Sequence, residues 1–138
     1  MTTYYPGRIR FNHVPVVQVH SGSGQDSNFT VTEGTLGKHY ELSGTIGVSG
    51  GVTGTLPSIT GSQSEGTVTR FWNNSKGVTH VLTGSDPQCF VYHNPVDYHV
   101  ASGTQFKMVS ERYSFVELTV LGGKYMVTAG SGSLIGEA

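Results

Sequence analysis

The sequence predicts an all-β protein, and three features of composition and pattern carry that prediction. Of the 138 residues, 20 are Gly and only 12% are charged, roughly twice the usual share of Gly and half that of charge. Ala, the strongest helix former, stands at three positions, whereas β-branched Val and Thr are abundant. Short runs of alternating apolar and polar residues recur along the chain. We therefore expect one all-β domain, an antiparallel β-sandwich or a jelly-roll-like fold.

Residues 1–27 are expected to form an extended N-terminal arm that precedes a β-sandwich domain over residues 28–138. The arm combines aromatic and β-branched residues with Pro6 and Pro15, and it ends in a Ser-Gly-Ser-Gly stretch. Proline lacks the backbone N–H that a central strand donates, so this segment suits an edge strand or a peripheral ribbon. Its apolar side chains predict that the arm lies on a partner.

Alternation of apolar and polar residues places the strands of the domain. In the run from Ser114 to Leu121, Val116, Leu118 and Val120 share one face, which predicts one buried and one wet side. The expected strands are 28–32, 39–42, 67–73, 78–82, 88–93, 98–101, 105–110, 114–121 and 124–129.

The segment 43–66 is rich in Gly, Ser and Thr, with single aliphatic residues spaced along it. Its glycine density excludes a helix. One interpretation is a long mobile loop. The interpretation we favour is that the aliphatic side chains pack against a neighbouring subunit, because a purely flexible linker has no use for them. These residues are Ile46, Val48, Val52, Leu56 and Ile59.

Charge and hydropathy argue against several partners and compartments. With 8 basic and 9 acidic residues, the chain has no electrostatic reason to bind nucleic acid or anionic lipid. The sequence holds no apolar run of membrane-spanning length and no secretory signal, so no membrane partner is expected. The single Cys89 cannot form an internal disulfide, which fits assembly in a reducing cytosol.

The histidines do not have the local spacing of a metal site. The densest group is His93 and His99 with Asp97 between them, but neither an i, i+4 helical pair nor an alternate-residue strand pair occurs. We expect ordinary surface or interface histidines and no metal, with a site shared around a trimer axis or a protonation switch as alternatives.

No pattern of a catalytic site is present. The carboxylates that could serve in catalysis fall on separate expected turns and strands; they are Asp86, Asp97, Glu111 and Glu117. The sequence contains neither a nucleophile elbow between a strand and a helix nor a glycine-rich phosphate loop that leads into a helix. We therefore expect neither enzymatic activity nor a cofactor.

Aromatic and amide residues make carbohydrate binding the stronger rival to a purely structural role. Trp72, Tyr92 and Tyr98 could stack on sugar rings while Asn73 hydrogen-bonds hydroxyl groups. Tyr113, Tyr125, Asn74 and Asp97 belong to the same wider set. The alternative is that the aromatic residues pack in the core or at an interface and that Asn73-Asn74-Ser75 is a turn.

Residues 66–128 resemble a β-module of tail-fibre and head-decoration proteins of tailed bacteriophages. In that module a Gly-led strand ends in an Asn-Asn-Ser turn, a second strand follows, and a later Gly precedes a Leu- or Met-rich strand before a closing aromatic hairpin. The corresponding parts of this chain are Gly66 to Ser75, Val78 to Leu82, Gly103 to Ser110 and Lys124 to Val127. The chain departs from the module at Glu111-Arg112-Tyr113, where a long strand replaces its short closing hairpin.

The resemblance implies a viral structural protein, typically a homotrimer. We expect a capsid decoration (cement) protein, located in the virion and assembled in the host cytoplasm, that binds other copies of itself and the major capsid protein. The arm residues Tyr4, Tyr5, Ile9 and Phe11 would then supply apolar contact with a partner, together with the aliphatic residues of segment 43–66. The alternative is a tail-fibre or receptor-binding module that recognises host-surface glycans.

Overall fold

The computed structural model describes residues 16–20, 28–44, 51–75, 77–84, 89–93, 100–103, 105–109 and 113–137. These residues form an all-β fold with two short 3-10 helices. The strands are β1 (Val16–His20), β2 (Asn28–Thr30), β3 (His39–Ser43), β4 (Thr53–Leu56), β5 (Val68–Asn73), β6 (His80–Gly84), β7 (Phe90–His93), β8 (Val100–Gly103), β9 (Gln105–Val109), β10 (Phe115–Leu121), β11 (Lys124–Ser131) and β12 (Ser133–Glu137); the 3-10 helices are η2 (Glu33–Thr35) and η3 (Ser62–Ser64).

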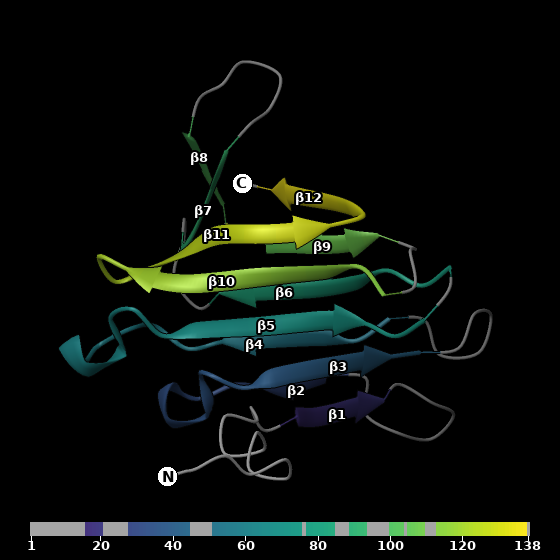
Figure 1. Cartoon of the computed structure of the whole chain (residues 1–138), viewed down its shortest axis with the longest axis horizontal. Coiled ribbons are helices and arrows are strands. Elements are labelled where there is room, and N and C mark those ends of the chain that lie inside the picture. The colour runs from purple at the N-terminus through teal and green to yellow at the C-terminus, as the bar shows by residue number, and fades with distance from the viewer. Residues whose placement is uncertain are drawn as a thin grey trace, which may run out of the picture.

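The strands make two sheets that lie one behind the other (Figure 1). Sheet A has seven strands in the order β1-β3-β5-β10-β11-β7-β8, and sheet B has five in the order β12-β9-β6-β4-β2. The prediction of an all-β protein is confirmed. Strand β1 is an edge strand, as expected for this segment, and its pairing with β3 carries residues 16–20 of the expected arm into sheet A.

The expectation of antiparallel sheets is wrong for five of the ten strand pairs. From β1 to β6 the chain alternates between the sheets, so that β1, β3 and β5 run parallel in sheet A and β2, β4 and β6 run parallel in sheet B. Neighbours in a sheet run the same way because each strand is followed by one in the other sheet rather than by a hairpin. We call strands β1 to β6 the parallel coil.

The strands that follow the coil extend both sheets mainly by antiparallel pairing. In sheet A, β10 pairs with β5 and with β11, and in sheet B, β9 pairs with β6 and with β12. The single parallel pair in this part is β7 with β11. The strand at 133–137 has no counterpart among the expected strands.

Apolar side chains from both sheets form one core. Val116, Leu118 and Val120 are buried, and Glu117 and Thr119 alternate with them at half-buried positions, as the sequence predicts. The other members of the core cluster are Val31, Tyr40, Leu42, Leu56, Phe71, Leu82, Cys89, Phe90 and Tyr125.

The proposal that the aliphatic residues of segment 43–66 face a neighbouring subunit is wrong for those that the structure describes. Val52 and Leu56 are fully buried, and Ile59 packs against the core of its own chain. The reason is that this segment contains β4, an interior strand of sheet B that pairs with both β2 and β6. Alternate residues of an interior strand must point into the core.

Two glycines in this segment are explained by close approach rather than by flexibility. A Cβ on Gly54 would collide with the ring of Phe29, and one on Gly51 would collide with the carbonyl oxygen of Thr79. Composition alone therefore misled the interpretation of this segment, because glycine here fits a packed strand. The remaining residues proposed for partner contact, Tyr4, Tyr5, Ile9, Phe11, Ile46 and Val48, lie outside the described residues.

Glutamates join successive turns at one corner of the coil. Glu33 in η2 accepts hydrogen bonds from the hydroxyl groups of Ser64 and Thr60, both at 2.6 Å, and from the N–H of Thr60. These bonds lower the pKa of Glu33 to about 2. Glu65 accepts bonds from the N–H groups of Gly122 and Gly123, at the turn between β10 and β11. Glu33 thus joins two successive turns of the coil, and Glu65 joins the coil to the β10–β11 turn.

Candidate functional site

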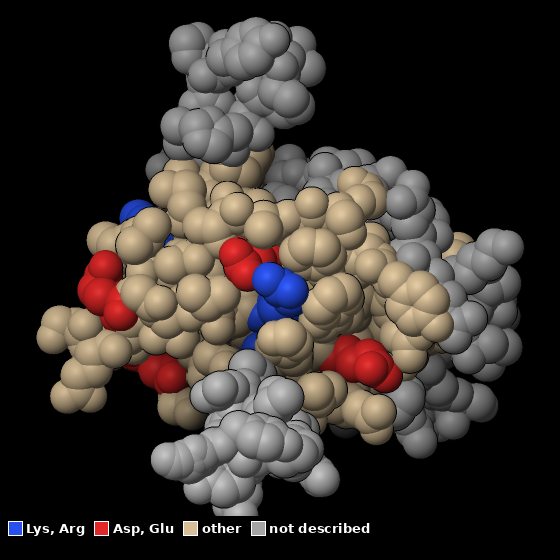
Figure 2. Space-filling view, viewed as in Figure 1, with Lys and Arg blue, Asp and Glu red and all other residues tan. Residues whose placement is uncertain are grey.

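The outer face of sheet A carries a group of polar and aromatic side chains that contact one another. Because side chains alternate along each strand, β3 directs His39 and Glu41 away from the core, β5 directs Arg70 and Trp72, and β10 directs Phe115 and Glu117. Figure 2 shows basic and acidic groups in contact at the centre of this face. We call these six residues the outer-face cluster.

Arg70 organises the centre of the cluster. Its guanidinium Nη2 donates to Oε1 of Glu117 at 2.6 Å, and the group lies 4.8 Å from the ring centre of Phe115 and 5.5 Å from that of Trp72. The two rings are themselves 4.9 Å apart. Glu117 also accepts a hydrogen bond from the hydroxyl group of Thr128. An arginine held by an ion pair and two rings fixes the orientation of those rings.

The indole of Trp72 is fixed at its other end by His39. Its Nε1–H donates to Nδ1 of His39 at 3.3 Å, so this histidine nitrogen is an acceptor and carries no proton. Burial lowers the pKa of His39, and the neighbouring charge of Arg70 lowers it further. The imidazole is therefore neutral at pH 7 and able to accept this bond.

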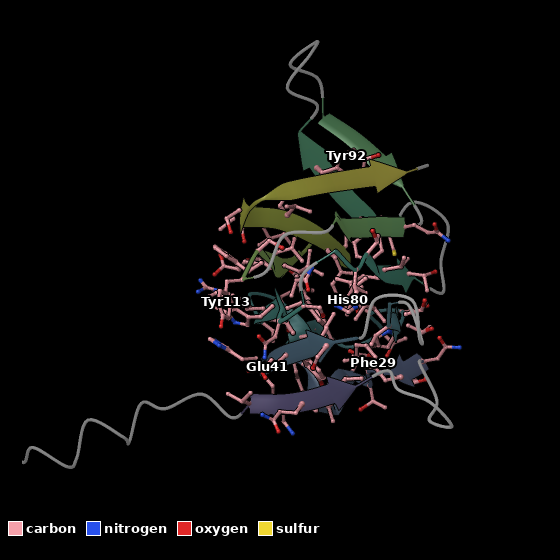
Figure 3. The ribbon with its side chains drawn as sticks, turned by 90° about the vertical axis from the view of Figure 1, so that its right-hand side faces the viewer. Phe29, Glu41, His80, Tyr92 and Tyr113 are labelled. Carbon is pink, nitrogen blue, oxygen red and sulfur yellow. The ribbon has the colours of Figure 1, made fainter. Side chains whose placement is uncertain are left out.

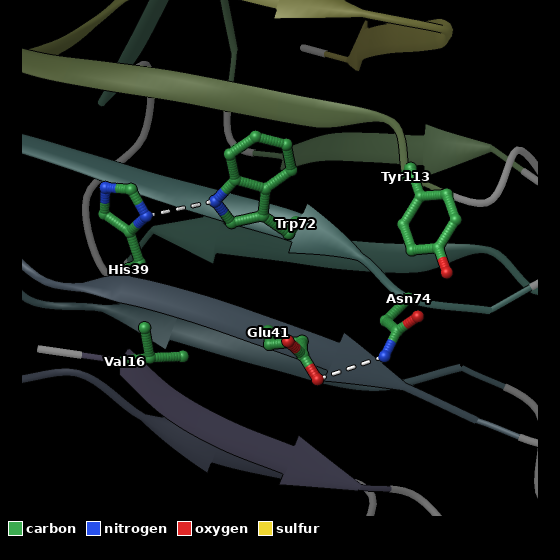
Figure 4. A pocket seen from close by; sticks show the side chains of 6 residues that line it. All are labelled: Val16, His39, Glu41, Trp72, Asn74 and Tyr113. Atoms are coloured by element: carbon green, nitrogen blue, oxygen red, sulfur yellow. Dashed lines mark hydrogen bonds between the residues drawn. The ribbon is translucent and has the colours of Figure 1, made fainter.

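Beside the cluster lies a shallow groove with a volume of about 470 Å³, lined by Val16, His39, Glu41, Trp72, Asn74 and Tyr113. Figure 4 shows Trp72 and Tyr113 along one side of it and Glu41 with Asn74 along the other. Nδ2 of Asn74 donates to Oε1 of Glu41 at 3.0 Å. In Figure 3, Glu41 and Tyr113 lie on the same side of the molecule. The groove thus has aromatic rings on one side and a hydrogen-bonded carboxylate and amide on the other.

Tyr113 occupies a costly backbone conformation at the end of this groove. Its φ is 67°, the one positive value among the described residues other than glycine, and its side chain is 64% exposed. Its N–H donates to the carbonyl oxygen of Asn73 at 2.6 Å, which anchors the backbone there. A bulky residue in the left-handed region costs about 1 kcal/mol or more relative to glycine. The chain thus keeps a large exposed ring where glycine or asparagine fits with less strain.

No protein-family model matches the chain, and no curated protein is significantly similar to it. The similarity of residues 66–128 to a bacteriophage module therefore stays a sequence-based expectation.

The residues predicted for glycan contact fall in different places. Trp72 lines the groove, but Asn73 is fully buried, and its side chain bonds to the N–H of Ser75 and the carbonyl of Val78. Asn73 therefore supports a turn, the alternative that the sequence offered, and its neighbour Asn74 reaches the groove. Tyr92 packs against the core, and Tyr98 lies outside the described residues.

Two groove residues, His39 and Glu41, were missed as candidates although their strand was predicted. The run His39-Tyr40-Glu41-Leu42 alternates polar and apolar residues, which already places His39 and Glu41 together on the wet face. Only the strand order could show that this face adjoins Trp72, because β3 and β5 are neighbours in a parallel pair. Sequence order separates the two strands by β4 in the other sheet.

The expectation of surface or interface histidines is wrong for His80, which is fully buried in a structural Ser–His pair elsewhere in the molecule. Nε2 of His80 lies 3.1 Å from Oγ of Ser75, while Nδ1 of His80 accepts the N–H of Val52 at 3.0 Å. Because Nδ1 accepts, Nε2 carries the proton in the neutral ring, and the serine is an acceptor there rather than an activated nucleophile. Oγ of Ser75 also accepts the N–H of Gly44. The pair joins loops of the coil between the sheets.

No three His, Cys, Asp or Glu side chains in the described ranges form a group that could hold a metal ion. Of the proposed shared site, Asp97 and His99 and the side chain of His93 lie outside what the structure describes. No helix among the described residues is long and apolar enough to cross a membrane.

Proposed function

We propose that this protein is a saccharide-binding module and that the groove on the outer face of sheet A is its binding site. The observation that carries the proposal is Tyr113, an exposed ring held beside the groove in a backbone conformation that other residues adopt at less cost. Strain of this kind persists where the side chain has a use. A ring exposed to this extent contributes little to the core, so its use lies at the surface.

The groove offers the two kinds of contact that a sugar needs. The indole of Trp72 and the ring of Tyr113 present apolar surfaces on which the C–H face of a pyranose can stack. Glu41 accepts hydrogen bonds from hydroxyl groups, and the amide of Asn74 both donates and accepts.

The contacts of Trp72 support binding because they hold the ring in place before a ligand arrives. Arg70, Phe115 and His39 contact it from its own face of the sheet. An aromatic side chain that is already ordered loses little conformational entropy when it binds, which raises affinity.

A location on a bacteriophage virion follows from the resemblance of residues 66–128, and a saccharide site fits its receptor-binding alternative. We further propose that the two sheets are the layers of a β-sandwich with mixed strand direction, the shared core lying between them. Such a module would present the outer face of sheet A to the host surface.

A glycan array with the wild-type protein, followed by calorimetric titration of the best ligand, tests the proposal. Trp72→Ala should weaken binding about tenfold or more, because the stacking surface is lost. Val68→Ala is the matched control, since Val68 is exposed on the same strand but does not line the groove. An array without hits, or equal affinity of the Trp72 variant, would refute the proposal.

Capsid decoration remains a second candidate because of strand β1. Among the described strands β1 pairs only with β3, and Val16–His20 contains neither a charged Lys, Arg, Asp or Glu nor a proline to block a further strand. Such an edge suits strand addition by another copy. Sedimentation should then show a trimer, which Gln18→Lys on the exposed side of β1 would dissociate. A monomer of 14.7 kDa would exclude this mode of assembly.

A further inference from the structure

The charge of the groove points to the class of saccharide that it binds. Among the described residues that line it, Glu41 supplies a carboxylate and there is no Lys or Arg. A carboxylate accepts hydrogen bonds and donates none. The groove can therefore receive hydroxyl donors at Glu41, and none of its described lining residues is a Lys or Arg that could pair with an acidic sugar.

The nearest cation of the outer-face cluster is already neutralised. Nη2 of Arg70 contacts Oε1 of Glu117 at 2.6 Å, and the two side chains are 31% and 19% exposed. This contact lowers the pKa of Glu117, so the carboxylate stays ionised and the pair stays intact at neutral pH. Phe115 and Trp72 also lie against the guanidinium, so Arg70 is engaged by three side chains and is not among the residues that line the groove.

His39 does not supply a positive charge either. Its Nδ1 accepts the indole N–H of Trp72, which requires an unprotonated nitrogen. The groups that face this ring are Arg70 and Glu117 across the sheet, Trp72 on β5 and the neighbouring Val16 on β1. A sugar carboxylate placed in the groove would thus meet the negative charge of Glu41, with no compensating Lys or Arg among the described residues that line it.

We propose that the groove selects neutral saccharides over acidic ones, and that Glu41, held by Asn74, sets this selection. Two adjacent hydroxyl groups of a neutral sugar can donate to the carboxylate, with Asn74 keeping it in place by the 3.0 Å bond to Oε1. A sialic or uronic acid would bring a like charge to the same position and lose affinity. This inference rests on the proposed saccharide-binding function.

The experiment compares neutral glycans with their sialylated or uronic-acid counterparts on one array and titrates the best pair by calorimetry. We expect the wild type to bind the neutral member at least about tenfold more tightly, and Glu41→Gln to bring that ratio close to one. Glu65→Gln removes the same charge at the coil corner, outside the groove, and should leave the ratio unchanged. Raising the salt concentration should reduce the wild-type ratio of neutral to acidic affinity, because salt screens the repulsion between Glu41 and the sugar carboxylate.

The outcomes separate this inference from the function on which it rests. Equal or tighter binding of acidic glycans, or an unchanged ratio in Glu41→Gln, overturns the assignment of charge selection to Glu41 while leaving saccharide binding in place. Absence of binding to both kinds of glycan overturns the proposed function, and the selection with it.

Discussion

Two histidines in different regions of the molecule accept a hydrogen bond at the same ring nitrogen. His80 lies between the sheets, is fully buried, and takes the backbone N–H of Val52 at Nδ1. His39 lies on the outer face of sheet A and takes the indole N–H of Trp72. Burial lowers the pKa of both. The first holds backbone loops of the coil together, and the second holds a side chain that borders an open groove.

The partner to which each histidine bonds, rather than its protonation, separates the structural His80 from the candidate functional His39. The interior network of His80, Ser75 and Asn73 is closed, because its partners are backbone groups and each other. On the outer face, His39 and Arg70 instead contact the rings of Trp72 and Phe115, which remain partly exposed to solvent. Loss of the first should therefore cost folding, and loss of the second should cost binding.

The largest expected effect is on stability, from His80→Ala. This change leaves the N–H of Val52 without its acceptor and opens a cavity in the core, so we expect a loss of about 3 kcal/mol in the free energy of unfolding. Urea denaturation measures it. His39→Ala is the matched control and should cost less than about 1 kcal/mol while weakening saccharide binding. If the two variants lose equal stability, the distinction between a structural His80 in the interior and a binding-related His39 on the outer face is wrong.

Acid should destabilise the protein in two steps that belong to different residues. Burial lowers the pKa of His80 to about 4, below its unfolded value near 6.5. The unfolded chain thus binds the extra proton first, and stability falls by about 3 kcal/mol as pH drops from 6.5 to 4. Glu33, with a pKa of about 2, adds a second loss as pH falls from 4.5 towards 2.

Denaturation curves across pH 7 to 2 test both steps. His80→Gln should remove the upper step, because glutamine does not titrate, and Glu33→Gln should remove the lower one. If Glu33→Gln still loses stability between pH 4.5 and 2 as the wild type does, the hydrogen bonds of Glu33 to Ser64 and Thr60 do not stabilise the fold.

The sequence predicts the fold class, most strands and the wet face of β10 because each of these depends on neighbouring residues. It does not predict which strands lie side by side. That His39 and Glu41 on β3 adjoin Trp72 on β5 follows from the parallel coil, which forms only when β4 joins the other sheet. Isolated aliphatic residues such as Val52 and Leu56 were misassigned for the same reason, because their role depends on a sheet that local pattern does not reveal.

Trp72 is the only tryptophan in the chain, so its fluorescence reports directly on the groove. Titration with a neutral saccharide selected from the array should give a saturable change in wild type. In Tyr113→Asn, which suits the positive φ without the ring, affinity should fall about tenfold while the melting temperature holds or rises. No response of Trp72 to any saccharide, or wild-type affinity in Tyr113→Asn, would contradict the assignment of this groove as the binding site.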